Sequence, residues 1–155
     1  MRTYLFVLEV ETMQVGAVYK SLPLHCTLMH WFNASITPED LIKKVTSVFK
    51  DRSPIELVSD APAMFGKNNN IPVHTVIMTQ TLQELHEELF SALNNLGAKH
   101  NEPAFVGSGF HPHVTTHGEQ SFPPESRIVT RNAYLVEALN KERLIKKIVA
   151  QIKFK

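Results

Sequence analysis

The sequence has only one cysteine, Cys26, which excludes an internal disulfide and any fold stapled by one. It also lacks a long hydrophobic run, since nothing approaches the roughly 18 consecutive apolar residues that a membrane-spanning helix requires. The apolar stretch near the N-terminus is interrupted by Glu9 and Glu11, so it is too short for a secretory signal peptide. These features favour a cytoplasmic protein that has no membrane partner.

The sequence also lacks an excess of charge of either sign. Its 16 Lys and Arg residues nearly balance its 15 Asp and Glu residues. Proteins that hold long duplex nucleic acid usually carry a marked basic excess, so no such ligand is expected here. A nucleic-acid ligand should instead be short, an RNA end or a single nucleotide. The length of 155 residues fits one domain, residues 1–155, and we expect a monomer.

Two segments have the apolar periodicity of long helices. The first begins with Thr37 as N-cap and Pro38 at the first helical position. The second is expected to begin at a Thr81 cap and to stop at Gly97, with leucines along one stripe. His86 lies in this second helix between charged neighbours, and it is expected to be a solvated surface residue.

Segments rich in β-branched and aromatic residues predict seven strands. They are residues 3–10, 23–33, 55–65, 71–78, 111–117, 127–139 and 143–154. The third and fourth form a hairpin, with Pro62 distorting the third strand or placing it at an edge. The last segment also suits a helix. The irregular order of strands, hairpins and helices favours an α+β fold with largely antiparallel sheets.

Two segments far apart in the sequence repeat the pattern His, any residue, Thr: "HCTLMH" and "HPHVTTH". Strand side chains alternate in direction, so His25 and Thr27 share one face while Cys26 points to the other and is expected to be buried. The same rule gives His113 and Thr115 a common face. If the two strands are neighbours, two imidazoles can flank one phosphorus atom as acid and base, and two hydroxyls can bind its oxygens. That chemistry requires no metal.

The paired motifs resemble those of the two-histidine (2H) phosphoesterase superfamily, which includes 2′-5′ RNA ligase-like proteins and 2′,3′-cyclic phosphodiesterases. The string "FHPHVT", the helix "LHEELFSALNNLG" before it and the order of elements also look like the family pattern, so the resemblance covers nearly the whole chain. It implies a bilobal fold with pseudo-twofold symmetry, in which two mainly antiparallel sheets with flanking helices surround a central groove. It further implies that His25 and His113 are the acid and base pair, that Thr27 and Thr115 bind phosphate, and that no cofactor is used.

The activity that the resemblance implies is a metal-independent phosphoesterase, with paired histidines hydrolysing a cyclic phosphate or a 2′-5′ phosphodiester of a nucleotide or short RNA. The resemblance leaves open which histidine is the acid, and whether the chain also ligates RNA. One alternative is a phosphodiesterase that degrades a cyclic oligonucleotide signal. Another is a protein that binds nucleotides or RNA ends without turnover.

The chain departs from the family pattern after the second motif, where many relatives have an arginine and this sequence has His117 and Gly118. His117, Lys67, Arg127 and Arg131 are the candidates to replace it. Aromatic residues can stack on a base, although core packing is expected for at least two of Trp31, Phe65 and Phe110. The candidates for substrate binding are therefore Phe65, Lys67, Phe110, His111, His117 and Arg131.

A metal site is the competing interpretation of the second motif. His111, His113 and His117 share a face, and imidazole is a common zinc ligand. Metal-bound histidines usually have carboxylate partners, however, and Glu119 is the only acidic residue close in sequence. No metal site is therefore expected, although a metal-dependent hydrolase stays an alternative. The basic C-terminal segment, residues 141–155, is expected to be a solvated sheet face.

Overall fold

The structure, a computed structural model, describes residues 1–118 and 120–155. The helices are α1 (Pro38–Phe49) and α2 (Gln80–Asn95), and two short 3-10 turns, η1 (Pro103–Phe105) and η2 (Gly107–Gly109), follow them. The strands are β1 (Arg2–Glu9), β2 (Val18–Tyr19), β3 (His25–Ala34), β4 (Ile55–Phe65), β5 (Ile71–Val76), β6 (Lys99–His100), β7 (His113–Thr115), β8 (Arg127–Thr130), β9 (Asn132–Ala138) and β10 (Lys146–Lys153). The predicted α+β class is confirmed.

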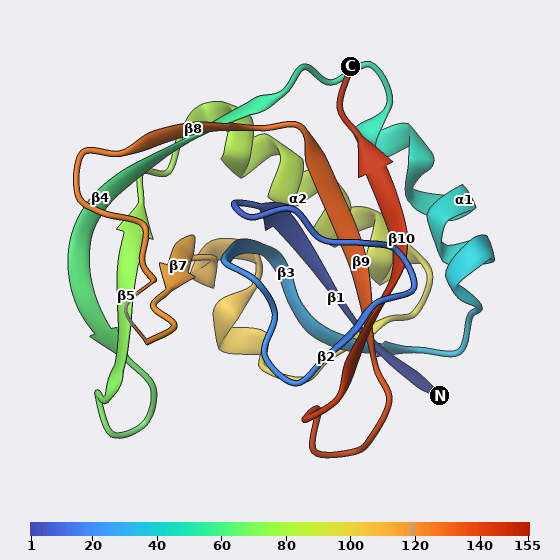
Figure 1. The fold of residues 1–155 in the computed structure, drawn as a ribbon. Coiled ribbons are helices and arrows are strands. Elements are labelled where there is room, and N and C mark those ends of the chain that lie inside the picture. The colour runs from blue at the N-terminus through green and yellow to red at the C-terminus, as the bar shows by residue number, and fades with distance from the viewer. Residues whose placement is uncertain (119) are drawn as a thin grey trace.

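The strands form one curled sheet in the order β2-β10-β9-β1-β3-β7-β5-β4-β8, with β6 on the side of β3 (Figure 1). All the strand pairs among the described residues are antiparallel, as expected. The half that contains β1 and β3 is completed by the C-terminal strands β9 and β10. The two halves of the sheet meet where β3 pairs with β7, so the two His-x-Thr segments are neighbours.

Side-chain caps fix where the two helices begin. Thr37 caps α1 as predicted, because its hydroxyl accepts the amide of the third helical residue at 3.2 Å. The cap of α2 is Thr79, whose hydroxyl accepts the Leu82 amide at 3.2 Å. The prediction of Thr81 was wrong, since that residue already lies inside the helix. Gly97 ends this helix with a φ of 81°, a conformation that favours glycine.

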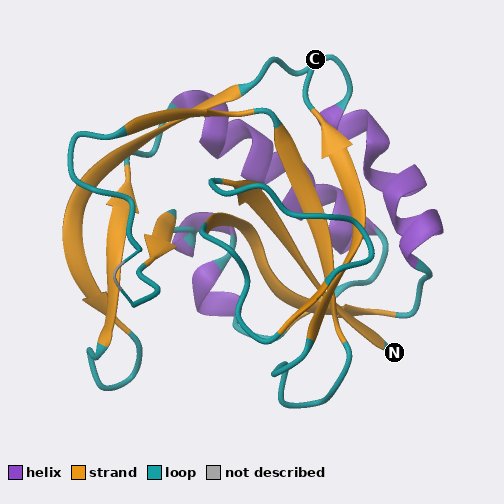
Figure 2. Cartoon of the chain, in the orientation of Figure 1, coloured by secondary structure: helices purple, strands orange, loops and turns teal. Residues whose placement is uncertain are grey.

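Both helices cover the same face of the sheet (Figure 2): α1 contacts α2 and β10, and α2 contacts β3. The main core lies between this face and the helices. A second apolar cluster lies on the other face, made of Leu5, Val7, Met13, Leu22, Trp31, Tyr134, Val136 and Ile148. The segment between β1 and β3 supplies Met13 and Leu22, and it crosses in front of the sheet in Figure 1. Because the helices cover one face of the sheet, a functional site on the sheet would lie on the other, helix-free face.

The second half of the chain departs from the predicted strands. Residues 127–139 were expected as one strand but form two, because β8 pairs with β4 while β9 pairs with β1 in the other half of the sheet. The chain bends between them at Arg131 to make this crossing. The final segment, which also suited a helix, is the strand β10. In β4 the pairing shifts register between Ser59 and Pro62, which fits the predicted distortion.

The described parts of the chain contain no helix that is long and apolar enough to cross a membrane.

Candidate active site

The two motif strands pair at a single residue position. Cys26 of β3 lies opposite Val114 of β7, and both side chains are completely buried in the main core. Burial raises the pKa of the Cys26 thiol to about 12, so it stays protonated and packs as a small apolar side chain, as predicted. The residues on either side of this pair point to the helix-free face, because strand side chains alternate.

The same register brings the four motif residues together on that face. The observed pair is Cys26–Val114, and continuing its antiparallel register by one residue in each direction aligns His25 with Thr115 and Thr27 with His113. Directly opposite residues have Cβ atoms roughly 4.5 to 5.5 Å apart. Each imidazole therefore has the hydroxyl of the other motif across from it. All four side chains are partly buried, so they are neither sealed in the core nor fully solvated.

Each imidazole is anchored to its own strand in the same way. His25 Nδ1 lies 2.8 Å from the carbonyl oxygen of Pro23, and His113 Nδ1 lies 2.8 Å from the carbonyl oxygen of His111. A carbonyl oxygen can only accept, so Nδ1 carries the hydrogen in both rings. The Nε2 atoms are the ones left to accept or donate a proton.

Both imidazoles favour the neutral form in the free protein. Burial lowers the pKa of His25 to about 4, the hydrogen bond to Pro23 opposes this, and positive charge on His117, His113 and Lys146 lowers it further. Burial also lowers the pKa of His113 below its usual value. An anionic ligand between the rings would reverse these shifts, because a negative charge favours imidazolium.

The carboxylate opposite His25 on the neighbouring strand does not act as its partner. Glu9 lies opposite His25 on β1, but both of its oxygens are occupied. One accepts the Tyr134 hydroxyl at 2.7 Å, and the other accepts the Asn132 side-chain amide at 2.9 Å. The imidazole is therefore held by a neutral carbonyl, and among the described residues no carboxylate raises its pKa.

The segment just before β3 gathers further basic groups beside His25. His117 Nδ1 lies 3.2 Å from the Ser21 hydroxyl, and Lys146 Nζ donates to the Lys20 carbonyl at 2.9 Å. His117 was a candidate from the sequence, but Lys146 was missed because the C-terminal segment was interpreted as a solvated face. The spacing of Lys146 and Ile148 could have predicted this position. The two residues are two apart and so point to the same face of β10, and Ile148 is buried there.

Two other candidates flank the second motif. The Phe65 ring meets the His113 ring edge-on, with centroids 4.7 Å apart, and lies 5.5 Å from the His111 ring. Lys67 is exposed in the turn between β4 and β5. Arg131 lies at the β8–β9 bend, where its carbonyl accepts the Phe154 amide, and no contact among the described residues joins it to the motif histidines. Phe65 and His111 are thus at the site, whereas Arg131 is not brought to it.

The prediction that His86 is a solvated surface residue was wrong. It is 1% exposed, because it lies on the leucine stripe of α2. Its Nδ1 donates to the Leu28 carbonyl at 2.8 Å, and its Nε2 accepts the Gly107 amide at 2.9 Å. The ring stacks on Phe110 at a centroid distance of 3.9 Å. His86 therefore ties β3 to the loop before the second motif, and Phe110 of that loop packs against the main core.

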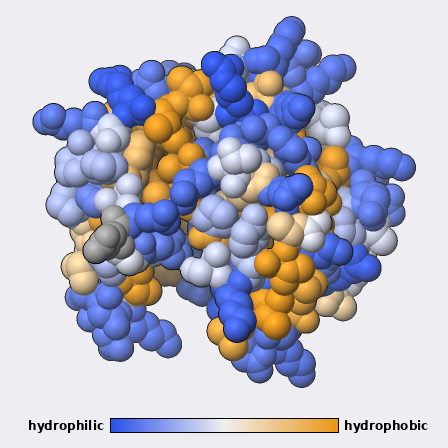
Figure 3. All heavy atoms as spheres, in the orientation of Figure 1, coloured by the Kyte–Doolittle hydropathy of each residue, from blue (hydrophilic) through white to orange (hydrophobic). Residues whose placement is uncertain are grey.

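A cluster of aromatic and charged side chains lies beyond Thr27 on β3. Trp31 is 8% exposed and packs in the second apolar cluster, so Trp31 and Phe110 meet the expectation that two of the three aromatics pack inside. The Arg143 guanidinium lies over the Trp31 ring at 5.8 Å, and it is 3.9 Å from the Glu102 carboxylate. Apolar side chains gather on the surface near the β9–β10 turn (Figure 3), where Leu139, Leu144 and Ile145 are exposed.

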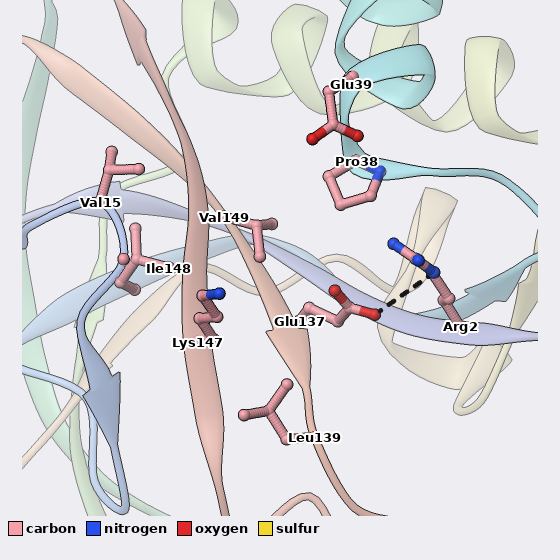
Figure 4. Close-up of a pocket in the computed structure, with 10 residues that line it drawn as sticks. Arg2, Val15, Pro38, Glu39, Glu137, Leu139, Lys147, Ile148 and Val149 are labelled. Atoms are coloured by element: carbon pink, nitrogen blue, oxygen red, sulfur yellow. Dashed lines mark ion pairs between the residues drawn. The ribbon is translucent and has the colours of Figure 1, made fainter.

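Two further features bear on the competing interpretations. Among the described residues no group of three or more His, Cys, Asp or Glu is arranged to hold a metal ion, and Glu119 lies outside those residues. A cavity of about 480 Å³ lies beside the start of α1, lined among others by Arg2, Glu39, Glu137 and Lys147 (Figure 4). No motif residue lines it, so it is separate from the paired histidines.

Comparison with known proteins gives both a family and a fold. The family model of the 2′-5′ RNA ligase superfamily matches residues 10–142. A solved structure described as a phosphoesterase is 15% identical, covers 99% of this chain and 98% of its own, and superposes with a TM-score of 0.62. E. coli LigT complexed with NADP+ and with 3′-AMP is 14% identical over 99% of this chain and 98% of its own, with TM-scores of 0.61 and 0.60. No curated protein matches by sequence.

Proposed function

The chain belongs to the 2′-5′ RNA ligase superfamily, and we propose that it is a metal-independent phosphoesterase acting on a cyclic phosphate or a 2′-5′ phosphodiester of a nucleotide or short RNA. The observation that carries this proposal is the β3–β7 pairing, which sets His25, Thr27, His113 and Thr115 on one face of the sheet. The matching anchors of the two imidazoles support it, because both rings leave Nε2 for proton transfer.

In the proposed hydrolysis the two histidines move one proton each. Nε2 of neutral His25 takes a proton from the attacking water as its oxygen bonds to phosphorus. Nε2 of protonated His113 gives a proton to the ribose oxygen as its bond to phosphorus breaks. The product is a phosphate monoester, and exchange of protons with solvent restores both rings. His25 is neutral above its pKa of about 4, which suits the base in this direction, and the roles exchange in the reverse reaction.

The threonine hydroxyls have a separate role in this proposal. Thr27 and Thr115 donate to the non-bridging oxygens of the phosphoryl group, where negative charge builds as the water attacks. In the register continued from the Cys26–Val114 pair, each hydroxyl is aligned with the imidazole of the other motif, so a phosphate held by both would lie between the two rings. The hydroxyls thereby position phosphorus for the proton transfers.

The residues around the second motif are the ones proposed to bind the nucleotide part of the substrate. Phe65 is partly exposed beside His113, so its ring can stack on a base or sugar of the bound nucleotide. His111 lies exposed beside Phe65 and can contact the same group. The E. coli LigT structures with 3′-AMP and with ATP support a nucleotide ligand for this fold.

An assay panel in EDTA tests the proposal. The purified chain is incubated with 2′,3′-cyclic mononucleotides, 2′-5′ oligoadenylates and cyclic dinucleotides, and products are separated by chromatography. We expect turnover of the first or second class. Loss of activity in EDTA with rescue by zinc would contradict metal independence. Saturable binding with no product would indicate a non-catalytic binder, and turnover of cyclic dinucleotides alone would indicate an enzyme that degrades a cyclic signal.

A further inference from the structure

We propose that Lys146 supplies the positive charge that neutralises the substrate phosphate, and that it forms an anion-binding subsite beside His25 together with His117 and Ser21. The inference rests on the proposed function, because it names the group that binds the phosphoryl oxygens of the same substrate. It also accounts for the missing arginine after the second motif, where this chain has His117 and Gly118.

The register of the sheet sets Lys146 on the face of the motif residues. Lys146 lies opposite Ala138 on β9, and two residues later Ile148 lies opposite Val136. Ile148 and Val136 belong to the second apolar cluster, on the helix-free face. Val7 of that cluster lies directly opposite Thr27. Lys146 therefore projects to the same face as Thr27 and His25, across the apolar residues of β9 and β1 from them.

One short segment holds Lys146 and the other basic groups together. The Lys20 carbonyl accepts from Lys146 Nζ at 2.9 Å, the Ser21 hydroxyl contacts His117 Nδ1 at 3.2 Å, and the Pro23 carbonyl accepts from His25 Nδ1 at 2.8 Å. The three basic side chains come from β10, from the loop after β7 and from β3. Four consecutive residues, 20–23, thus gather groups that are far apart in the sequence.

The charge of Lys146 has no carboxylate to balance it in the described parts of the chain, where the ion pairs involve other cations. The side chain is partly buried, and burial together with the Arg143 charge lowers its pKa. A partly desolvated cation normally has a counter-charge, and a bound phosphate would provide one. An ammonium group, with three donors, is well suited to phosphate oxygens. Arg127, by contrast, is already paired with Glu56 at 2.7 Å.

The test compares Lys146→Met with Lys147→Met. Lys147 is the adjacent residue on β10, but it is exposed and lines the cavity on the opposite face. We measure the Kd of inorganic phosphate by calorimetry, and KM and kcat for the substrate that the panel identifies. Lys146→Met should raise both Kd and KM at least tenfold, with a smaller change in kcat, and Lys146→Arg should restore most of the affinity. Lys147→Met should match the unaltered protein.

Phosphate binding separates this inference from the proposed function. If the unaltered chain binds phosphate, Lys146→Met binds it at least tenfold more weakly and no substrate turns over, then the subsite stands and the enzymatic proposal fails. Equal Kd values for phosphate in Lys146→Met, Lys147→Met and the unaltered chain overturn the subsite, whatever the activity. Failure of the unaltered chain to bind phosphate overturns it as well. Urea unfolding midpoints confirm that the variants compared are folded.

Discussion

His25 and His113 are held by the same hydrogen bond: each ring donates Nδ1–H to the carbonyl two residues before it, at 2.8 Å in both cases. The two strands are neighbours in the sheet, so the repeated local geometry places two equivalent rings on one face. A side chain fixed in one tautomer needs little rearrangement when it transfers a proton, which is what general acid and base catalysis requires.

Removing a motif hydroxyl should weaken turnover without abolishing it. Thr27→Val and Thr115→Val keep the side-chain shape but lose one donor to a charged phosphate, which is worth about 1.5 to 3 kcal/mol. We expect kcat to fall roughly tenfold to a hundredfold in steady-state assays. Thr116→Val, at the next position on the alternate side of the chain, is the control and should change kcat little. Equal losses in Thr115→Val and Thr116→Val would contradict the phosphate-binding role.

The rate should depend on pH with a bell shape whose maximum lies on the acid side of neutrality. The base must be neutral, and His25 is neutral above its pKa of about 4. The acid must be protonated, and His113 is protonated only below a pKa that burial lowers from the usual 6.5. The apparent pKa values of the acid and alkaline limbs of the profile describe the pair of histidines rather than either ring alone, because the rings interact. A profile of kcat/KM that rises through pH 7 to a plateau, with no alkaline limb, would exclude this pair of roles.

His86 should be important for stability. His86→Leu leaves the buried Leu28 carbonyl and the partly buried Gly107 amide without partners, which should lower the free energy of unfolding by about 2 to 5 kcal/mol. Urea titration measures this. Gln83→Leu, at an exposed position of the same helix, should change stability by less than about 0.5 kcal/mol. A His86→Leu effect as small as that of the control would show that these two hydrogen bonds do not form.

The stability should also fall as the pH is lowered, because of the same residue. Burial lowers the pKa of His86 in the folded chain, so the folded state favours the neutral ring. The stabilisation is present above the unfolded-state pKa of about 6.5 and is lost as the pH falls through the folded value. The loss between pH 7 and 5 should be smaller in His86→Leu than in the unaltered chain. Identical pH dependence in the two proteins would argue against a buried neutral ring.

The two threonines near the start of α2 provide a test of the helix boundary. Thr79→Ala removes the cap on the Leu82 amide and should cost about 1 kcal/mol of unfolding free energy. Thr81→Ala should cost nothing or stabilise slightly, because alanine is the better helix former inside a helix. Urea unfolding of both variants measures the difference. A larger loss of unfolding free energy in Thr81→Ala than in Thr79→Ala would show that Thr81 is the cap, as the sequence suggested.

Local rules predicted much of the fold and the faces of the motif residues. Alternation along a strand was enough to put His25 with Thr27 and to bury Cys26, because both depend only on adjacent residues. Periodicity located both helices, but it placed the cap of the second at Thr81, two residues after Thr79, whose extended backbone makes it the cap in the structure. Local pattern fixes the type of an element better than its end.

The contacts that the sequence did not reveal join distant parts of the chain. His86 is buried because its partners come from β3 and from the loop at Gly107, 58 and 21 residues away. Lys146 approaches the site through a carbonyl 126 residues earlier in the chain. The bend at Arg131 exists because β8 and β9 join different halves of the sheet. Such pairings depend on the topology, which no short pattern encodes.

The most direct test of the account is turnover of the preferred substrate in EDTA by His25→Ala, His113→Ala and the double variant. A general acid or base contributes about a hundredfold to ten-thousandfold to the rate. The kcat of each single variant should therefore fall at least about a hundredfold. The double variant should lose little more, because the two rings act as a unit. Far-UV circular dichroism should remain that of the unaltered chain. Full activity in the double variant would contradict catalysis by the paired histidines.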